Sequence, residues 1–221
     1  MVDDMVDEQI KAGVIGLGAM GAPMARHLKT AGMLKVVWNR TASKADALAK
    51  EIGTVAADDP ARLAVACNII LTCVSADQDL LDVVELLLPG IQPGSVVIDT
   101  STVSPATARQ IASRLKEVGC GFVDAPVSGG VEGAQKGTLS VMAGGSDADV
   151  ARAMPVLEAI SATVTRMGPV GFGQATKAVN QVIVAGIAEA VCEALALSEK
   201  LELPSERLLP VLGAGAAGSW F

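Results

Sequence analysis

Gly16-Leu17-Gly18-Ala19-Met20-Gly21 follows a short apolar run at residues 11–15 and precedes a helical stretch. A G-x-G-x-x-G motif between a strand and a helix predicts a dinucleotide-binding turn. The first glycine permits the tight turn, the second lets the backbone approach a pyrophosphate, and the third allows close helix packing. Unpaired N–H groups at the start of the helix then face the anion. A glycine turn without a ligand is the alternative at this point.

Apolar β-branched runs alternate with helical stretches through the first two thirds of the chain. Such βαβ alternation predicts an α/β fold with a doubly wound, mainly parallel sheet that is covered on both faces. We expect strands at residues 11–15, 35–38, 68–74, 95–99, 121–124, 139–143 and 163–165, and helices at 19–31, 43–52 (with Ser43 as its cap), 77–87, 105–118 and 147–160.

The alternation of short strands and helices stops at residues 174–201, a run without proline and with a single glycine. It predicts a long helix that is apolar on several sides and therefore buried along much of its length. Glu189 and Glu193 within it argue against a membrane span. Pro204 ends this helix and starts another. Because so short a helical segment leaves apolar surface without a partner, residues 174–221 are expected to form an incomplete domain that associates into homo-oligomers.

Composition limits both the partners and the chemistry. A formal charge of −7 argues against nucleic acid as a partner. The acidic residues 1–8 lack the basic region of a secretory signal. There is no Tyr, and the single His, His27, is expected to be a solvated helix residue, so proton transfer falls to Lys, Asp, Glu or Cys. The cysteines form no C-x-x-C pair and predict reduced core residues of a cytoplasmic protein, without a metal: Cys67, Cys73, Cys120 and Cys192.

The end of the second expected strand carries Asn39-Arg40-Thr41. An NAD site commonly places an Asp or Glu there for the ribose 2′-hydroxyl. Arg40 instead offers a planar set of donors that suits a 2′-phosphate, which favours NADP over NAD. Use of both cofactors, or a solvated Arg40 without a ligand, are the alternatives.

Hydroxyl side chains follow two other strands at the carboxyl edge of the sheet, where ligands bind. Val74-Ser75 and Thr102 are therefore candidates for cofactor contact, with helix capping as the alternative. Ser128-Gly129-Gly130 follows a further strand, and its N–H groups can bind a carboxylate. On spacing alone, a glycine-rich turn explains this last motif equally well.

Lys177, Asn180 and Gln181 share one face near the start of the long helix. Burial of such a polar group costs free energy, which indicates a purpose. Desolvation lowers the pKa of a lysine and would let Lys177 move a proton near neutral pH. A half-exposed lysine at the helix start is the alternative.

Three motifs occur together in one order: Gly-Leu-Gly-x-Met-Gly-x-x-Met-Ala at 16–25, Asp-Ala-Pro-Val-Ser-Gly-Gly at 124–130, and Lys-x-x-Asn-Gln at 177–181. They resemble the β-hydroxyacid dehydrogenase family, which includes 3-hydroxyisobutyrate dehydrogenase, tartronate semialdehyde reductase, and glyoxylate and succinic semialdehyde reductases. The resemblance implies a Rossmann-type domain (10–170), a long interdomain helix and an all-helical C-terminal domain (174–221), of which this chain holds only the start.

The resemblance also implies roles for individual residues. Lys177 matches the catalytic lysine, which donates a proton to the carbonyl oxygen as hydride arrives. The pyrophosphate would be held by Gly16, Leu17, Gly18, Ala19, Met20 and Gly21, the adenosine ribose by Asn39, Arg40 and Thr41, and the nicotinamide half by Val74, Ser75 and Thr102. The substrate would be bound by Ser128, Gly129, Gly130, Asn180 and Gln181.

Three features depart from the family pattern. Gln181 stands where many members have Asn, as in the tartronate semialdehyde reductase branch. Arg40 stands where that branch often has an acidic residue. Family members also continue beyond the Gly-Ser-Trp turn at 218–220 with further helices.

Our leading hypothesis is an NADP(H)-dependent oxidoreductase that interconverts a small β-hydroxyacid or hydroxy acid and its semialdehyde or oxo acid. An NAD-linked 3-hydroxyisobutyrate dehydrogenase is one alternative. A truncated dinucleotide-binding protein without turnover is the other.

Overall fold

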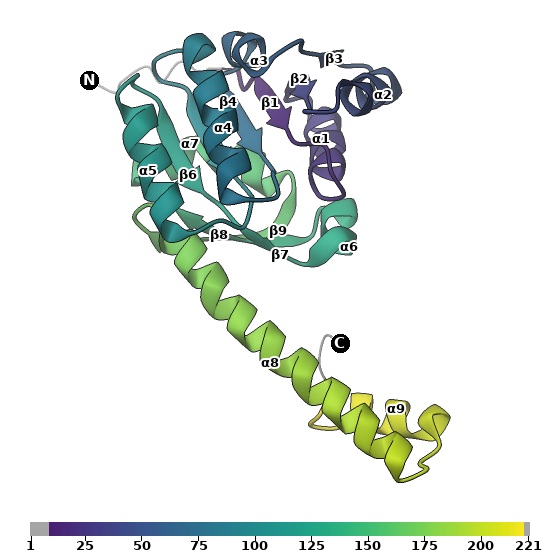
Figure 1. Cartoon of the computed structure of the whole chain (residues 1–221). Coiled ribbons are helices and arrows are strands. Elements are labelled where there is room, and N and C mark those ends of the chain that lie inside the picture. Colours follow the sequence, from purple (N-terminus) through teal and green to yellow (C-terminus); the bar gives the residue numbers. More distant parts are fainter. Residues whose placement is uncertain (1–8, 219–221) are drawn as a thin grey trace, which may run out of the picture. The chain divides into compact units, whose positions relative to one another are not determined.

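Figure 1 shows a computed structural model of the chain, which describes residues 9–218. The acidic residues 1–8 and the expected turn at Trp220 lie outside the described residues. The strands are β1 (Ala12–Ile15), β2 (Leu34–Trp38), β3 (Val55–Ala56), β4 (Ile69–Thr72), β5 (Val96–Asp99), β6 (Gly121–Asp124), β7 (Val127–Ser128), β8 (Leu139–Gly144) and β9 (Ser161–Gly168). The helices are α1 (Gly21–Thr30), α2 (Ala42–Ile52), α3 (Pro60–Ala66), α4 (Asp77–Leu87), the 3-10 turn η1 (Leu88–Gly90), α5 (Pro105–Lys116), α6 (Gly130–Lys136), α7 (Asp147–Glu158), α8 (Phe172–Lys200) and α9 (Ser205–Ala214).

The strands form one mainly parallel sheet in the order β3-β2-β1-β4-β5-β6-β8-β7, with β9 paired to β8. Pairing is parallel from β3 through to β6, whereas β6 and β7 both run antiparallel to β8. The predicted doubly wound α/β fold is therefore confirmed. The chain order reverses between β1 and β4, which is where ligands bind to sheets of this kind.

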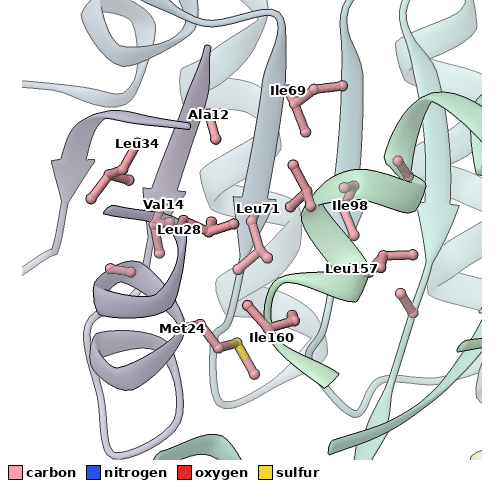
Figure 2. Close-up of a cluster of buried hydrophobic side chains, with 14 of the residues drawn as sticks. Ala12, Val14, Met24, Leu28, Leu34, Ile69, Leu71, Ile98, Leu157 and Ile160 are labelled. Carbon is pink, nitrogen blue, oxygen red and sulfur yellow. The ribbon is translucent and has the colours of Figure 1, made fainter. Parts of the chain in front are cut away.

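One face of the sheet packs against α1, α2 and α7. Figure 2 shows Val14, Leu71 and Ile98 on neighbouring strands. Val14 and Leu71 lie toward Met24 and Leu28 of α1, and Ile98 lies toward Leu157 of α7. These side chains are all fully buried. Because the burial of each large aliphatic side chain contributes about 1.5–3 kcal/mol, this layer fixes α1 and the glycine turn before it against the sheet.

The other face packs against α3, α4 and α5. It uses the alternate strand positions, such as Ile15, Ile70 and Val97, because successive side chains of a strand point to opposite faces. These residues meet Leu63 of α3 and Leu80 of α4, both fully buried. Strands that are buried on both faces explain the continuous apolar runs in the sequence.

Two compact units divide the chain, residues 1–177 and residues 178–221. In the second unit, almost every described side chain of α8 is at least partly exposed, with Ser198 as the buried exception. The expectation that the long helix is buried along much of its length is therefore wrong for this chain. Most of its apolar side chains in that unit remain exposed, for example Val182 and Ile183.

Helix α8 is also long and apolar enough, by length and composition, to cross a membrane. A single helix of this kind is weak evidence, because core helices of soluble proteins pass the same test. Glu189 and Glu193 lie within it. The predicted absence of a membrane partner therefore stays a prediction.

Several local expectations differ from the structure. Thr41, and not Ser43, is the N-cap of α2, and no side-chain cap bond forms there. The elements β3, α3, β7 and α6 were not expected, because each has only two to seven residues and too few for a periodic pattern. Strand β9 is longer than the expected strand at 163–165. Pairing with β8 extends it over flanking residues of weaker β-propensity.

Two side chains lie elsewhere than expected. His27 is half-buried, and its Nε2 lies 3.1 Å from the carbonyl oxygen of Ala134 and 3.0 Å from that of Gln135. It therefore joins α1 to the end of α6 instead of being solvated. Cys192 is exposed and not a core residue, because it lies on the open surface of α8, although all four cysteines are free.

Candidate active site

A cavity of about 470 Å³ lies at the carboxyl ends of β1, β2 and β4, at the reversal of the sheet order. Trp38, Lys44, Cys73, Asp79 and Asp82 are among its lining residues. It also brings together most of the residues that the sequence assigns to the cofactor, namely Gly16, Gly18, Asn39, Arg40, Thr41, Val74 and Ser75. Leu17, Ala19, Met20, Gly21 and Thr102, which were assigned with them, do not line it.

The three glycines of the turn serve two different purposes. Gly16 has φ +88°, and a Cβ there would overlap the carbonyl oxygen of Cys73. A Cβ on Gly21 would overlap the carbonyl oxygen of Gly16. Both glycines are therefore required by the fold. A Cβ on Gly18 would meet nothing within 4 Å, so the protein itself does not explain this glycine, whereas a ligand close to the backbone does.

The turn also presents free donors. The N–H groups of Ala19, Met20 and Gly21 have no acceptor within residues 9–218, whereas Ala22 already donates to the carbonyl of Gly18. Such orphan groups at a helix start, together with the helix dipole, bind anions. The residues present thus fit the pyrophosphate of a dinucleotide.

Asn39 holds this turn in shape. Its Oδ1 accepts a hydrogen bond of 2.9 Å from the backbone N–H of Leu17, and its Nδ2 donates to the carbonyl of Thr41 at 3.1 Å. The amide therefore ties the end of β2 to the glycine turn. This contact explains an Asn at position 39 without any ligand.

Arg40 extends over the same cavity and is paired with an acid. Its Nη1 lies 2.7 Å from Oδ1 of Asp79 in the first turn of α4. The Arg40 side chain is 83% exposed and that of Asp79 is 27% exposed. The guanidinium is thus accessible to a ligand, although one edge already binds a carboxylate.

A buried hydrogen-bond network fixes the loops after β4 and β5. Oδ1 of Asp99 accepts hydrogen bonds from the Thr72 hydroxyl at 2.8 Å and from the Ser101 hydroxyl at 2.6 Å. Ser101 Oγ in turn accepts the N–H of Val74 at 2.8 Å. Val74 lines the cavity. Asp99 therefore helps to position this part of the cavity wall, because it holds the Ser101 hydroxyl that binds the Val74 N–H.

A second buried carboxylate sets the start of α8. Asp124, at the end of β6, accepts the N–H of Gly171 at 2.7 Å and the N–H of Gln174 at 2.9 Å. The Gln174 side chain donates to the carbonyl of Ser101 at 2.8 Å and accepts the N–H of Val103 at 3.2 Å. The first turn of α8 is therefore joined both to β6 and to the loop after β5.

Lys177 follows Gln174 by three residues and shares its side of the helix. It is 9% exposed, and its ammonium has no hydrogen-bond or ion-pair partner in the described part of the chain. Burial lowers the pKa of this lysine. A desolvated, unpaired ammonium of this kind is suited to proton transfer.

The expected substrate residues lie on three elements. Ser128 ends β7 and is half-buried, and Gly129 and Gly130 are exposed at the start of α6, both with positive φ. Asn180 and Gln181 follow Lys177 in α8 and belong to the second unit, where Asn180 Nδ2 donates to Gln181 Oε1 at 3.0 Å.

Sequence reasoning missed Asp99, Asp124 and Gln174 as parts of the site. A signal was present for the two acids, since each ends a strand that is otherwise apolar. A carboxylate at such a position is buried and needs donors. For Gln174 no comparable signal exists, because its partners lie about 70 residues earlier in the chain. No group of three or more His, Cys, Asp or Glu able to hold a metal occurs in residues 9–218.

Two family models match the chain in sequence. The NAD binding domain of 6-phosphogluconate dehydrogenase matches residues 11–168, and the NAD-binding domain of NADP-dependent 3-hydroxyisobutyrate dehydrogenase matches residues 171–221. An uncharacterized oxidoreductase of Shewanella frigidimarina is 40% identical over 95% of this chain and 73% of its own length. The chain belongs to the β-hydroxyacid dehydrogenase family. It is thus an NAD(P)-dependent oxidoreductase that acts on CH–OH groups.

Two further relatives match this chain over most of their own length. The NAD-dependent L-serine dehydrogenase of Pseudomonas aeruginosa is 34% identical over 93% of this chain and 70% of its own. The structure of Mycobacterium tuberculosis 3-hydroxyisobutyrate dehydrogenase with L-serine has a TM-score of 0.86 and 30% identity, and the match covers 96% of this chain and 72% of that one. The resemblance predicted from the three motifs is confirmed.

The buried carboxylates predict how stability depends on pH. Burial raises the pKa of Asp99 and that of Asp124 from 3.8 to about 6. The folded chain therefore binds these protons more tightly than the unfolded chain, and stability falls as the pH rises from about 4 to about 6. Asp99→Asn should remove part of that fall, on the order of 1–3 kcal/mol in the free energy of unfolding. Urea denaturation at each pH measures it.

The matched control is Asp46→Asn, at an exposed position of α2. It should keep the wild-type pH dependence. An identical slope for wild type and Asp99→Asn would contradict the assignment to Asp99.

Proposed function

We propose that this chain catalyses reversible hydride transfer between NADP(H) and a small hydroxy acid or its semialdehyde or oxo acid, with Lys177 as acid and base. The observation that carries the proposal is Lys177, which is 9% exposed and whose ammonium has no partner among residues 9–218. It follows the clamp formed by Asp124 and Gln174. The nicotinamide supplies or accepts the hydride when it is bound. The protein must therefore supply the proton, and the chain has no tyrosine to do so.

Lys177 performs the proton step in both directions. In reduction, its ammonium donates a proton to the carbonyl oxygen as negative charge develops there. In oxidation, the neutral amine accepts the proton of the substrate hydroxyl. Burial lowers the pKa of Lys177, which brings the charged and neutral forms closer in free energy near neutral pH.

The substrate carboxylate is assigned to Ser128, Gly129 and Gly130. The Ser128 hydroxyl and the N–H groups that follow it offer several donors to one anion. Asn180 and Gln181 are assigned to orient the substrate. A hydroxy acid agrees with the relatives, one of which is named for L-serine oxidation and another of which was solved with L-serine.

NADP is the preferred cofactor in this proposal. Arg40 lies over the cavity with most of its side chain exposed, and Lys44 lines the same cavity. Two cations suit a 2′-phosphate, and the matching C-terminal family model is named for an NADP-dependent enzyme. An NAD-linked 3-hydroxyisobutyrate dehydrogenase is the alternative, and the NAD-dependent serine dehydrogenase favours it.

The proposed setting is the cytoplasm, without nucleic acid or membrane as a partner. The net charge of −7 and the free cysteines support it. In the second unit, large apolar side chains such as Val182 (74% exposed) and Val211 (69% exposed) face solvent. Such patches are typical of protein interfaces, and we assign this one to homo-oligomers.

Replacement of the lysine tests the mechanism. Lys177→Met should lower kcat about 10²–10⁴-fold, because proton transfer by a placed acid contributes that factor. The Kd for NADPH should stay within about twofold. Oxidation of NADPH with glyoxylate, tartronate semialdehyde and succinic semialdehyde measures the rate. Lys50→Met, at an exposed position of α2, is the control. Equal rates for wild type and Lys177→Met would remove Lys177 from the mechanism.

Replacement of the arginine tests the cofactor assignment. Arg40→Ala should raise the KM for NADPH about tenfold or more, since a charge-assisted contact to phosphate is lost, and should leave the KM for NADH nearly unchanged. Steady-state kinetics with both cofactors measures this. Arg62→Ala, at an exposed position of α3, should change neither value. An unchanged preference in Arg40→Ala would contradict the NADP assignment.

Association is tested by light scattering. Because the exposed apolar side chains of residues 178–218 lose contact with water on association, we expect a dimer or a larger oligomer at micromolar concentration. Val182→Glu should shift the mass toward the monomer, whereas Glu189→Gln should not. A monodisperse wild-type monomer would rule out the homo-oligomer.

A further inference from the structure

The proposed cofactor cavity contains charges of both signs. Arg40 and Lys44 come from the end of β2 and the start of α2, and Asp79 and Asp82 come from α4 on the other side. An acid beside a phosphate-binding arginine opposes phosphate binding, and Asp79 occupies such a position next to Arg40. The family fold does not require it, because its carboxylate binds no backbone group of the described chain.

Asp79 and Arg40 are in direct contact. The distance from Arg40 Nη1 to Asp79 Oδ1 is 2.7 Å, and it joins two elements that are 39 residues apart in sequence. Asp82, by comparison, accepts its hydrogen bond from Gln78 on its own helix at 2.7 Å. Asp79 is therefore the acid that competes with a ligand for the Arg40 guanidinium.

We propose that Asp79 limits the preference for NADP over NAD, by weakening the binding of a dinucleotide 2′-phosphate to Arg40. This inference rests on the proposed function, in which Arg40 binds that phosphate. A phosphate that uses the remaining donors of Arg40 lies within one guanidinium width of the Asp79 carboxylate. That separation is shorter than the Debye length of about 8 Å at physiological ionic strength, so the two anions repel. NAD carries no 2′-phosphate and escapes this repulsion.

The opposite effect of Asp79 would require the ion pair to hold Arg40 in the position that binds the phosphate. The exposure of the pair argues against it. Arg40 remains 83% exposed while paired, so the contact does not fix it in a packed position. Exposed ion pairs of this kind order their side chains only weakly. A phosphate with about −1.5 to −2 charges experiences a larger repulsion from a neighbouring carboxylate. The net effect of Asp79 is therefore to weaken NADP binding.

Asp79→Asn tests the proposal, because it removes the charge and keeps the size. We expect the Kd for NADP⁺ to fall about three- to tenfold, where tenfold corresponds to 1.4 kcal/mol. The Kd for NAD⁺ should stay within about twofold. Isothermal titration calorimetry of the full chain with each dinucleotide measures both values. At 0.5 M KCl the gain should shrink, because salt screens the repulsion.

Glu85→Gln is the matched control. Glu85 lies on the same helix and is also paired with an arginine, Arg114, but it does not line the cavity. The control removes the same charge from α4 and should leave both Kd values unchanged. Circular dichroism and the Tm of each variant confirm folding.

Arg40→Ala separates failure of this inference from failure of the proposed function. If Arg40→Ala leaves NADP⁺ binding unchanged, the cofactor assignment itself is wrong. If Arg40→Ala weakens NADP⁺ binding while Asp79→Asn leaves it equal or weaker, only the role of Asp79 is overturned. An equal gain for NADP⁺ and NAD⁺ in Asp79→Asn would also overturn it, since the effect would then not involve the 2′-phosphate.

Discussion

The carboxylate of Asp124 receives the N–H groups of Gly171 and Gln174, and this contact decides where the long helix α8 begins. A negative charge at a helix start is favoured by the unpaired N–H groups and by the helix dipole. Because Lys177 lies one turn further along α8, its place follows from that of Asp124. The clamp has an electrostatic cost, since burial raises the pKa of Asp124 to about 6. The free energy of the apolar core must offset it.

Gln174 connects this clamp to the cofactor side of the site. Its side chain binds the backbone of Ser101 and Val103, while the Ser101 hydroxyl binds both Asp99 and the N–H of Val74. A continuous set of buried hydrogen bonds therefore runs from the cavity wall to the first turn of α8. In such networks each polar group depends on its neighbours, because an unpaired buried group is costly. Within residues 9–218, Oδ2 of Asp99 is the only fully buried side-chain nitrogen or oxygen without a hydrogen-bond partner.

The turn at Gly16 and the apolar strands were predictable because they depend on local chemistry. A positive φ or a close backbone approach requires glycine, and a strand buried on both faces requires a continuous run of apolar residues. Short elements such as β3 and α6 have too few residues to show a comparable pattern in the sequence. The prediction that α8 is buried was wrong for a related reason. The apolar composition of a helix indicates that its surface is covered by a partner, but it does not show whether that partner lies in the same chain.

By itself, the sequence determined the order of the longer strands and helices, the position of the glycine turn and the type of residues available for proton transfer. These properties follow from side-chain shape, period and chemistry along a continuous segment. Only the tertiary structure decided that Asp124 and Gln174 hold the start of α8, and that Asp79 faces Arg40. Each of these contacts joins residues 39 to 73 positions apart. Such contacts exist only once the parallel strands bring their carboxyl ends to one edge of the sheet, and no local pattern encodes which side chains then meet.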